Sequence, residues 1–301
     1  MNVIDTDDYA ASGIKTFQFP GGEWHVEVPT WRFGSAHIFT KMRSFNQFGP
    51  LLGVISALRS QGLSVHVFAP YLPGLRQDRN PSGNTPLTSR IVGNLLREAS
   101  SVTTVDPHSR VGLAEFARGY GTPATVRKVP AEVYLPDMLT EKYTHILVPD
   151  AGAVERATET AQILGIPNIV KAHKVRDFGT GRLTGFTIED GLSSDSKNPL
   201  PRESRILLAD DICDGGGTFL GLLRVLREIN YETPIDLFVT HGIFSQGVKV
   251  LLGGPKQFNR VITTNSWYDP IHTSHDDYRY LEGGRLVVHD ILPYYIGGLT
   301  P

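Results

Sequence analysis

Short apolar runs alternate with apolar residues at helical spacing along both halves of the chain. The predicted strands are 65–69, 102–105, 146–148, 206–208 and 235–239. The predicted helices are 51–58, 88–96, 152–164 and 219–229. Short apolar runs bounded by turn residues are typical of buried parallel strands, and helices between them are typical crossover connections. The pattern therefore predicts an α/β protein with two mostly parallel sheets flanked by helices.

The length of 301 residues suits two domains of about 150 residues each. We expect the boundary near 136–141, which gives domains 1–138 and 139–301. The segment 171–204 is rich in Gly, Ser, Asp and Arg, which is typical of a long mobile loop. The tail after Trp267 carries little pattern and is compatible with a closing helix or strand.

Composition and charge exclude several classes of function. There are 29 Lys and Arg against 31 Asp and Glu, without the basic cluster that nucleic-acid or membrane surfaces use. No apolar run is long enough to span a bilayer, and the acidic segment 1–13 does not resemble a signal peptide. The single cysteine, Cys213, excludes a disulfide framework and indicates a reducing cytoplasm, with a buried apolar role for its thiol.

The most informative stretch is RILLADDICDGGGTFLGLL, in which an aliphatic run leads into a polar loop and then a helical pattern. In order, the loop carries Asp210, Asp211, Asp214, Gly215, Gly216, Gly217 and Thr218. Glycines let backbone N–H groups approach a phosphate, and the threonine can cap the helix. The adjacent carboxylates repel a phosphate but suit sugar hydroxyls, a divalent cation, or both. We favour a ribose-phosphate site over the alternative, a strand that ends in a solvated acidic turn.

This loop resembles the PRPP-binding loop of type I phosphoribosyltransferases and of ribose-phosphate pyrophosphokinases (PRPP synthetases). The usual pattern is aliphatic residues, Asp-Asp, two residues and then Asp-Thr-Gly-Gly-Thr, and Gly215 stands where the first Thr is expected. Six further motifs follow the order of the PRPP synthetase family between Phe19 and Ser245. The resemblance implies two tandem phosphoribosyltransferase-like domains, the first binding ATP and the second binding a ribose phosphate.

Two motifs of the first half resemble the ATP-binding segments of that family. The stretch FPGGE resembles Phe-Ser-Asp-Gly-Glu, which implies that Phe19 and Glu23 hold adenine from a neighbouring subunit, although glycine replaces the Asp. The stretch APYLPGLRQDR resembles Pro-Tyr…Ala-Arg-Gln-Asp-Arg, which implies that Arg76, Gln77 and Asp78 bind the nucleotide. The alternatives are a plain hairpin turn and a charged surface loop.

Other motifs imply metal ligands and a catalytic loop. VDPHS resembles Val-Asp-Leu-His-Ala, which implies that His108 holds the Mg²⁺ of Mg–ATP. PDAGAVERA resembles Pro-Asp-Gly-Gly…Arg-Ala, in which the carboxylate of Asp150 suits Mg²⁺ or a hydroxyl of the substrate. A lone histidine is often structural, and Mg²⁺ prefers oxygen, so only the motif supports His108. Lys174 and Arg176 match the Lys-x-Arg of a loop that closes over the reacting phosphates. THGIFS matches over 240–245, where we expect a structural turn.

Together the motifs imply an enzyme that transfers the β,γ-diphosphoryl group of ATP to the anomeric hydroxyl of a ribose 5-phosphoryl acceptor, with Mg²⁺ as cofactor. The expected assembly is a homo-oligomer built from dimers, with a hexamer as one option. Gly215 loses a phosphate contact worth about 1.5–3 kcal/mol and opens space, so the acceptor is either ribose 5-phosphate, giving PRPP, or ADP-ribose, giving ADP-ribose pyrophosphate for NAD synthesis. The alternatives are a phosphoribosyltransferase that consumes PRPP and a non-catalytic regulatory PRPP-synthetase paralogue.

Overall fold

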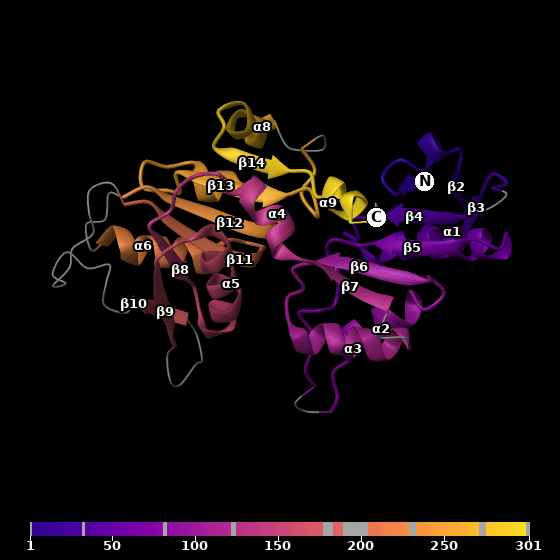
Figure 1. The fold of residues 1–301 in the computed structure, drawn as a ribbon, viewed down its shortest axis with the longest axis horizontal. Coiled ribbons are helices and arrows are strands. Elements are labelled where there is room, and N and C mark those ends of the chain that lie inside the picture. Colours follow the sequence, from indigo (N-terminus) through magenta and orange to yellow (C-terminus); the bar gives the residue numbers. More distant parts are fainter. Residues whose placement is uncertain are drawn as a thin grey trace. The chain divides into compact units, whose positions relative to one another are not determined.

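The computed structural model (Figure 1) divides into two compact units, residues 1–130 with 292–301, and residues 131–291. It describes residues 2–31, 34–80, 83–121, 125–176, 183–188, 204–228, 233–270 and 275–298. The division falls at 130/131 instead of the expected 138/139, and the last helix groups with the first unit. Within the described ranges, no helix is long and apolar enough to cross a bilayer.

The first unit is built on a five-stranded sheet in the order β1-β4-β5-β6-β7, with every neighbouring pair parallel. Its strands are β1 (Asn2–Asp5), β4 (Ser35–Phe39), β5 (Ser64–Phe68), β6 (Ser101–Val105) and β7 (Val126–Val129). Its helices are α1 (Phe48–Ser60), α2 (Thr88–Leu95), α3 (Arg110–Tyr120) and α9 (Leu292–Gly297), with short 3₁₀ turns at Tyr9–Ser12 and Phe45–Gln47. The helices flank the sheet because the strands are apolar on both faces (Figure 1).

A hairpin of β2 (Lys15–Gln18) and β3 (Trp24–Glu27) packs against α1 of this unit. A Cβ added to Gly49 would come within 2.4 Å of Trp24, and one added to Gly53 would come within 3.0 Å of Val26. Positions four residues apart lie on one face of a helix. The two glycines therefore form the surface on which the hairpin is seated.

Helix α9 joins the first unit through the side chain of Tyr295. Its ring stacks on Phe68 of β5 with centroids 4.4 Å apart and an interplanar angle of 7°. Its hydroxyl lies 2.8 Å from Nδ1 of His37 on β4. The chain thus returns to its first sheet after completing the second, and the closing helix expected in the tail is present.

The second unit is built on a seven-stranded sheet in the order β10-β9-β8-β11-β12-β13-β14, parallel except for β10. Its strands are β8 (His145–Val148), β9 (Asn168–Arg176), β10 (Leu183–Ile188), β11 (Ile206–Cys213), β12 (Ile235–Gly242), β13 (Arg260–Thr264) and β14 (Leu286–His289). Its helices are α4 (Ala131–Met138), α5 (Val154–Leu164), α6 (Gly217–Glu228), α7 (Lys249–Leu252) and α8 (His275–Glu282). The predicted fold class of two mostly parallel, helix-flanked sheets is confirmed.

Two segments of the second unit differ from the sequence-based expectation. The strand predicted over 206–208 continues to Cys213, because β12 pairs with it along its whole length. Part of the expected loop over 171–204 forms the hairpin of β9 and β10, in which buried Phe186 lies against Gly221 of α6. Residues 177–182 and 189–203 of that segment lie outside the described residues.

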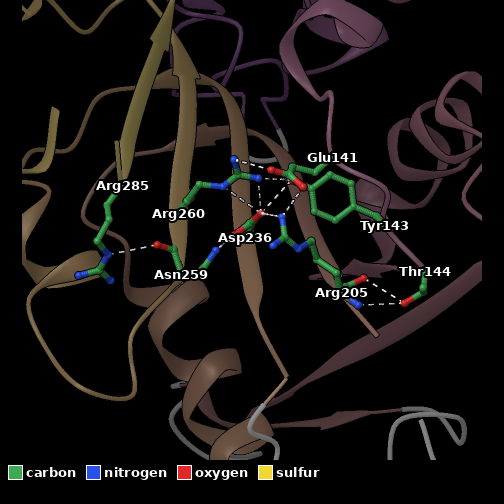
Figure 2. A network of polar contacts seen from close by, with 8 residues as sticks. All are labelled: Glu141, Tyr143, Thr144, Arg205, Asp236, Asn259, Arg260 and Arg285. Carbon is green, nitrogen blue, oxygen red and sulfur yellow. Dashed lines mark hydrogen bonds and ion pairs between the residues drawn. The ribbon is translucent and has the colours of Figure 1, made fainter. Parts of the chain in front are cut away.

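A buried ion-pair network ties together the amino ends of β8, β11, β12 and β13 (Figure 2). At its centre is Asp236 of β12, which is fully buried. Its Oδ2 accepts from Nη2 of Arg260 at 2.8 Å and from the Tyr143 hydroxyl at 2.9 Å. Glu141 adds ion pairs of 2.7 Å to Arg205 and 3.2 Å to Arg260. This end of the sheet is therefore held by charges that satisfy one another.

Candidate functional site

The carboxyl ends of β8, β11 and β12 meet at one edge of the second sheet, because these strands are parallel neighbours. Asp150 follows β8, the segment 214–216 follows β11, and Ser245 follows β12. Helix α6 begins directly after the β11 loop, at Gly217. Loops at the carboxyl ends of parallel strands are where open α/β sheets bind ligands. The loops at this carboxyl-terminal edge of the sheet form the candidate site.

Two adjacent carboxylates of β11 share one arginine of α5. The ladder between β11 and β8 ends at Leu208, so among the described residues no strand pairs with the last part of β11 on that side. There, Nη1 of Arg156 lies 3.2 Å from Oδ1 of Asp210 and 3.4 Å from Oδ1 of Asp211. The backbone N–H of Asp211 also donates to Oδ1 of Asp210 at 2.9 Å. We call Asp210 and Asp211 the acid pair.

Burial makes it costly to ionise both carboxylates of the acid pair. Asp211 is only 3% exposed, and the side chain of Asp210 is 18% exposed. Burial and the neighbouring carboxylate raise the pKa of Asp210 to about 8, although Arg156 lowers it. When both carboxylates are ionised, one guanidinium faces two negative charges in a site that water barely reaches. Hydroxyl donors or a cation from a ligand would therefore be favourable here.

The glycine loop leads from the acid pair into α6. Gly216 has a φ of +77°, and a Cβ there would come within 3.0 Å of Leu251, so this position requires glycine. Thr218 lies inside the first turn of α6 instead of at the capping position before it. The first N–H groups of a helix have no partner within the helix, so they can donate to an anion. The loop therefore suits a phosphate.

The stretch THGIFS holds the glycine loop in place, in agreement with the structural role expected for it. The backbone N–H groups of Ile243 and Phe244 donate to the carbonyl of Cys213 at 2.9 and 3.1 Å. The N–H of Ser245 donates to the carbonyl of Asp214 at 3.2 Å. Cys213 itself is fully buried in the core, and burial raises the pKa of its thiol to about 12. The thiol is a buried apolar group, as predicted.

Asp150 lies at the same edge and caps the start of the helical segment that leads into α5. Its Oδ1 accepts from the N–H groups of Gly152 at 2.9 Å and Ala153 at 3.2 Å. Among the residues the structure describes, no three His, Cys, Asp or Glu side chains form a preassembled metal site. Mg²⁺ is usually held by one or two carboxylates, waters and substrate phosphates, so a single half-buried carboxylate fits it.

Lys174 and Arg176 lie on β9, where their backbones pair with Phe186 and Leu183 of β10. The expectation placed both at the start of a mobile loop, whereas the structure places their backbones in a strand. Their side chains lie outside the described part of the chain.

The predicted ATP-binding loop of the first unit follows β5 and is anchored to two helices. Arg76 and Gln77 are exposed, and the Gln77 amide oxygen accepts from the Thr88 hydroxyl at the start of α2. The Ser109 hydroxyl donates to Oδ2 of Asp78 at 2.5 Å and accepts from an N–H of α3 at 2.8 Å. Asp78 thus fixes the loop, and the two preceding residues are exposed on it.

The other predicted residues of the first unit are exposed. His108 lies in the turn after β6, next to the turn residue Asp106 with its φ of 38°. Phe19 is 46% exposed at the tip of the β2–β3 hairpin. Its ring makes an edge contact with the ring of Phe17, and the two ring centroids are 5.0 Å apart. The N–H of Phe19 donates to the carbonyl of exposed Glu23 at 2.8 Å. The hairpin turn considered as an alternative is present, and its tip presents an aromatic ring and a carboxylate.

The predicted residues therefore gather in three places, apart from Lys174 and Arg176, which lie on β9. Asp150 and the segment 210–218 share the carboxyl edge of the second sheet. The segment 76–78 and His108 follow adjacent strands of the first sheet, and the hairpin carries Phe19 and Glu23. Arg156 is the residue that sequence reasoning missed as a site residue. It belongs to one of the matched motifs, but spacing alone gave no partner for it.

Known proteins match this chain over most of its length. The phosphoribosyl transferase domain family matches residues 125–242. The ribose-phosphate pyrophosphokinase of Pyrococcus furiosus is 27% identical over 266 residues, which cover 86% of this chain and 88% of that protein. The Corynebacterium efficiens ribose-phosphate pyrophosphokinase is 27% identical over 224 residues, which cover 72% of this chain and 63% of that protein, just under two thirds of its length.

A solved structure shares the fold. The crystal structure of phosphoribosylpyrophosphate synthetase from Mycobacterium smegmatis matches with a TM-score of 0.75 at 21% identity, over 99% of this chain and 97% of that chain. The motif order, the paired α/β units and these relatives agree. The chain is therefore a distant relative of the ribose-phosphate pyrophosphokinases (PRPP synthetases), at about 27% identity, and it shares the fold of one of them.

Proposed function

We propose that the protein is a Mg²⁺-dependent diphosphokinase. It moves the β,γ-diphosphoryl group of ATP to the anomeric hydroxyl of a ribose 5-phosphoryl acceptor and releases AMP. The observation that carries the proposal is the junction of β11 and α6, where the acid pair and a glycine-lined helix start lie within one loop. Carboxylates accept from the hydroxyls of a diol, and the first N–H groups of a helix donate to a phosphate.

Each half of the acceptor has its own partners in this proposal. Asp210 and Asp211 accept from the sugar 2- and 3-hydroxyls, and the segment 214–218 holds the 5-phosphate. Lys174 and Arg176 neutralise charge on the transferred group and on departing AMP. Such phosphoryl chemistry depends mainly on in-line positioning and charge neutralisation, so no strong general base is needed.

The nucleotide belongs to the first unit in this proposal. Arg76 offers a two-pronged contact to the ATP phosphates, Gln77 offers an amide, and Asp78 holds their loop. Phe19 and Glu23 bind adenine in a neighbouring subunit, which makes the working assembly a homo-oligomer built from dimers. Exposed aromatic and carboxylate groups on one hairpin tip suit a purine face and its amine.

Mg²⁺ is the proposed cofactor, with His108 and Asp150 as its protein ligands. When bound, it neutralises the charge of the polyphosphate. The carboxylate of Asp150 is the hard oxygen donor that Mg²⁺ prefers. The single cysteine is free and buried, which suits a reducing compartment, and we place the enzyme in the cytoplasm.

The acceptor is ribose 5-phosphate or ADP-ribose, and Gly215 bears on the choice. A Cβ there would lie 3.6 Å from Gln246 and 3.8 Å from Ser245, which are ordinary contact distances. The position can therefore take a side chain, and its glycine leaves room beside the phosphate. That room supports an acceptor whose 5-phosphate continues as a diphosphate, whereas the acid pair and loop suit both acceptors.

The direct test supplies ATP and Mg²⁺ with each sugar separately and follows AMP release. AMP with ribose 5-phosphate alone would identify a PRPP synthetase, and AMP with ADP-ribose alone would identify the diphosphate-tolerant variant. No AMP with either sugar would refute the proposal. Pyrophosphate release from PRPP and a nucleobase would then favour a phosphoribosyltransferase. Stimulation of an active family partner without turnover would favour a regulatory paralogue.

Two substitutions at Gly215 sharpen the choice of acceptor. Gly215→Thr restores the hydroxyl that the family pattern carries, and Gly215→Val adds the same volume without it. For ribose 5-phosphate we expect the Thr variant to lower KM by about 10-fold relative to the Val variant. For ADP-ribose both variants should raise KM equally, because both fill the space. Equal KM values for the two variants with ribose 5-phosphate would contradict the hydroxyl argument.

A further inference from the structure

We infer that Arg156 is a positioning residue for the acceptor, which acts by holding Asp210 and Asp211 side by side as a two-carboxylate receptor for a diol. The inference rests on the proposed function, because the diol belongs to the proposed acceptor. It assigns a role to a residue outside the loop that carries the family's sugar-phosphate pattern.

The contacts show one cation bridging two anions. The same nitrogen, Nη1 of Arg156, lies within 3.4 Å of Oδ1 on both carboxylates. All three side chains are largely shielded from water, with exposures of 17% for Arg156, 18% for Asp210 and 4% for Asp211. Exposed ion pairs contribute little, but an ion pair in this setting restricts where both carboxylates can point.

The position of Arg156 is itself fixed by the site. Arg156 is the third residue of α5, directly after the short turn that Asp150 caps. The N–H groups of Gly152 and Ala153 donate to the Asp150 carboxylate, which sets where α5 begins. The carboxyl end of β8 therefore determines where the guanidinium meets β11.

Without this cation, the acid pair would not present two charged acceptors. Neighbouring side chains on a strand point to opposite faces, and two buried carboxylates repel. One of them would retain a proton or turn away. The pKa of Asp210 is already raised to about 8 by burial and by Asp211, against the lowering effect of Arg156. The bridging contact lowers the pKa of Asp210 and holds both side chains, so the diol meets two oriented carboxyl groups.

The test compares Arg156→Gln, Arg156→Lys and the control Arg224→Gln, which removes an exposed arginine from α6 of the same unit. Steady-state kinetics give kcat and the KM for ATP and for whichever acceptor the wild-type enzyme uses. We expect Arg156→Gln to raise the acceptor KM by about 10-fold or more, with the ATP KM within about 2-fold. Arg156→Lys should recover part of the loss, and the control should match wild type.

A purely structural role for Arg156 predicts a different pattern. Equal changes in both KM values, an unchanged acceptor KM, or a Lys variant as weak as the Gln variant would overturn the inference. If Arg156→Gln does not fold, the acceptor-to-ATP KM ratio of Arg156→Lys decides in the same way. Calorimetric measurement of ribose 5-phosphate and ADP-ribose binding to wild type and variants tests the role of Arg156 separately from the proposed function. Wild type that binds a sugar without releasing AMP would refute the proposed function, and the variants' binding would still test Arg156.

Discussion

The two ends of the second sheet surround their buried carboxylates with different sets of partners. At the amino end, the carboxylate of Asp236 accepts from Arg260, Tyr143 and Asn259, with Arg205 3.9 Å away. Glu141 forms a further ion pair with each of the two arginines. At the carboxyl end, the two carboxylates of the acid pair share the one guanidinium of Arg156. Each cluster centres on a buried aspartate, Asp236 of β12 at one end and Asp211 of β11 at the other (Figure 2 shows the first).

The difference separates a structural cluster from a site that calls for a ligand. Around Asp236 the hydrogen-bonding capacity of the carboxylate is met within the protein, so a ligand has nothing to add. At the acid pair two neighbouring carboxylates share the guanidinium of Arg156, and burial together with the charge of Asp211 raises the pKa of Asp210. Burial of charge is common to both ends, and the balance of partners distinguishes them.

Removing the carboxylate of Asp236 should have the largest effect of these changes, and the effect should be on stability. Asp236→Ala removes the buried carboxylate that Arg260 and Tyr143 donate to and leaves Glu141 as the shared partner of Arg260 and Arg205, so we expect the free energy of unfolding to fall by about 3–5 kcal/mol. Urea denaturation followed by tryptophan fluorescence measures this. The acceptor KM of the remaining folded enzyme should be unchanged. A loss below about 1 kcal/mol would mean that the network does not hold the strand ends.

Removing one charge of the acid pair should have the opposite effect to Asp236→Ala: activity with the acceptor should fall, and stability should be kept. Asp211→Asn keeps the shape but weakens a charged hydrogen bond worth about 1.5–3 kcal/mol, so kcat/KM for the acceptor should fall by about 10–100-fold. The midpoint of urea unfolding should not decrease. Asp236→Asn is the matched control, expected to lower stability and leave the acceptor KM unchanged. Equal effects of both variants on stability would erase the contrast between the two ends.

The pH dependence of stability should also report the acid pair. Because the pKa of Asp210 rises from 3.8 to about 8 on folding, the native state holds more protons between these values, and the free energy of unfolding falls as pH rises through that window. Asp210→Asn cannot ionise. We expect its stability advantage over wild type to grow from about pH 4 to about pH 8, by up to roughly 5 kcal/mol at about 1.4 kcal/mol per pKa unit. A gain independent of pH in urea titrations would contradict this.

The smallest effect concerns the thiol beside the glycine loop. Burial raises the pKa of Cys213 to about 12, so a thiol reagent at about pH 8 should react with it only after unfolding. The rate of colour release with a disulfide reagent, with and without denaturant, checks this. Rapid labelling of the native enzyme would mean that the loop opens readily. Ribose 5-phosphate or ADP-ribose, whichever the enzyme uses, should then slow the labelling.

The local pattern of apolar residues was enough to predict the parallel strands and their helices, because each of these elements has a recognisable pattern within its own short segment. It stopped β11 at its first carboxylates, although Ile212 and Cys213 continue the strand against β12. It also missed the hairpin of β9 and β10, since antiparallel pairing depends on residues that lie apart in sequence. The role of Arg156 depends on α5 packing beside β11, which no spacing within the chain encodes.

The return of the chain to its first sheet through α9 has a consequence for protein engineering. A polypeptide cut after Ile291 would contain all strands of both sheets but would uncover the ring of Phe68 and remove the phenol that meets His37. Isolating the amino-terminal half as a separate folding unit therefore calls for a graft: residues 292–298 joined by a short linker behind residue 130. The first unit of the fold is therefore not one continuous stretch of the sequence.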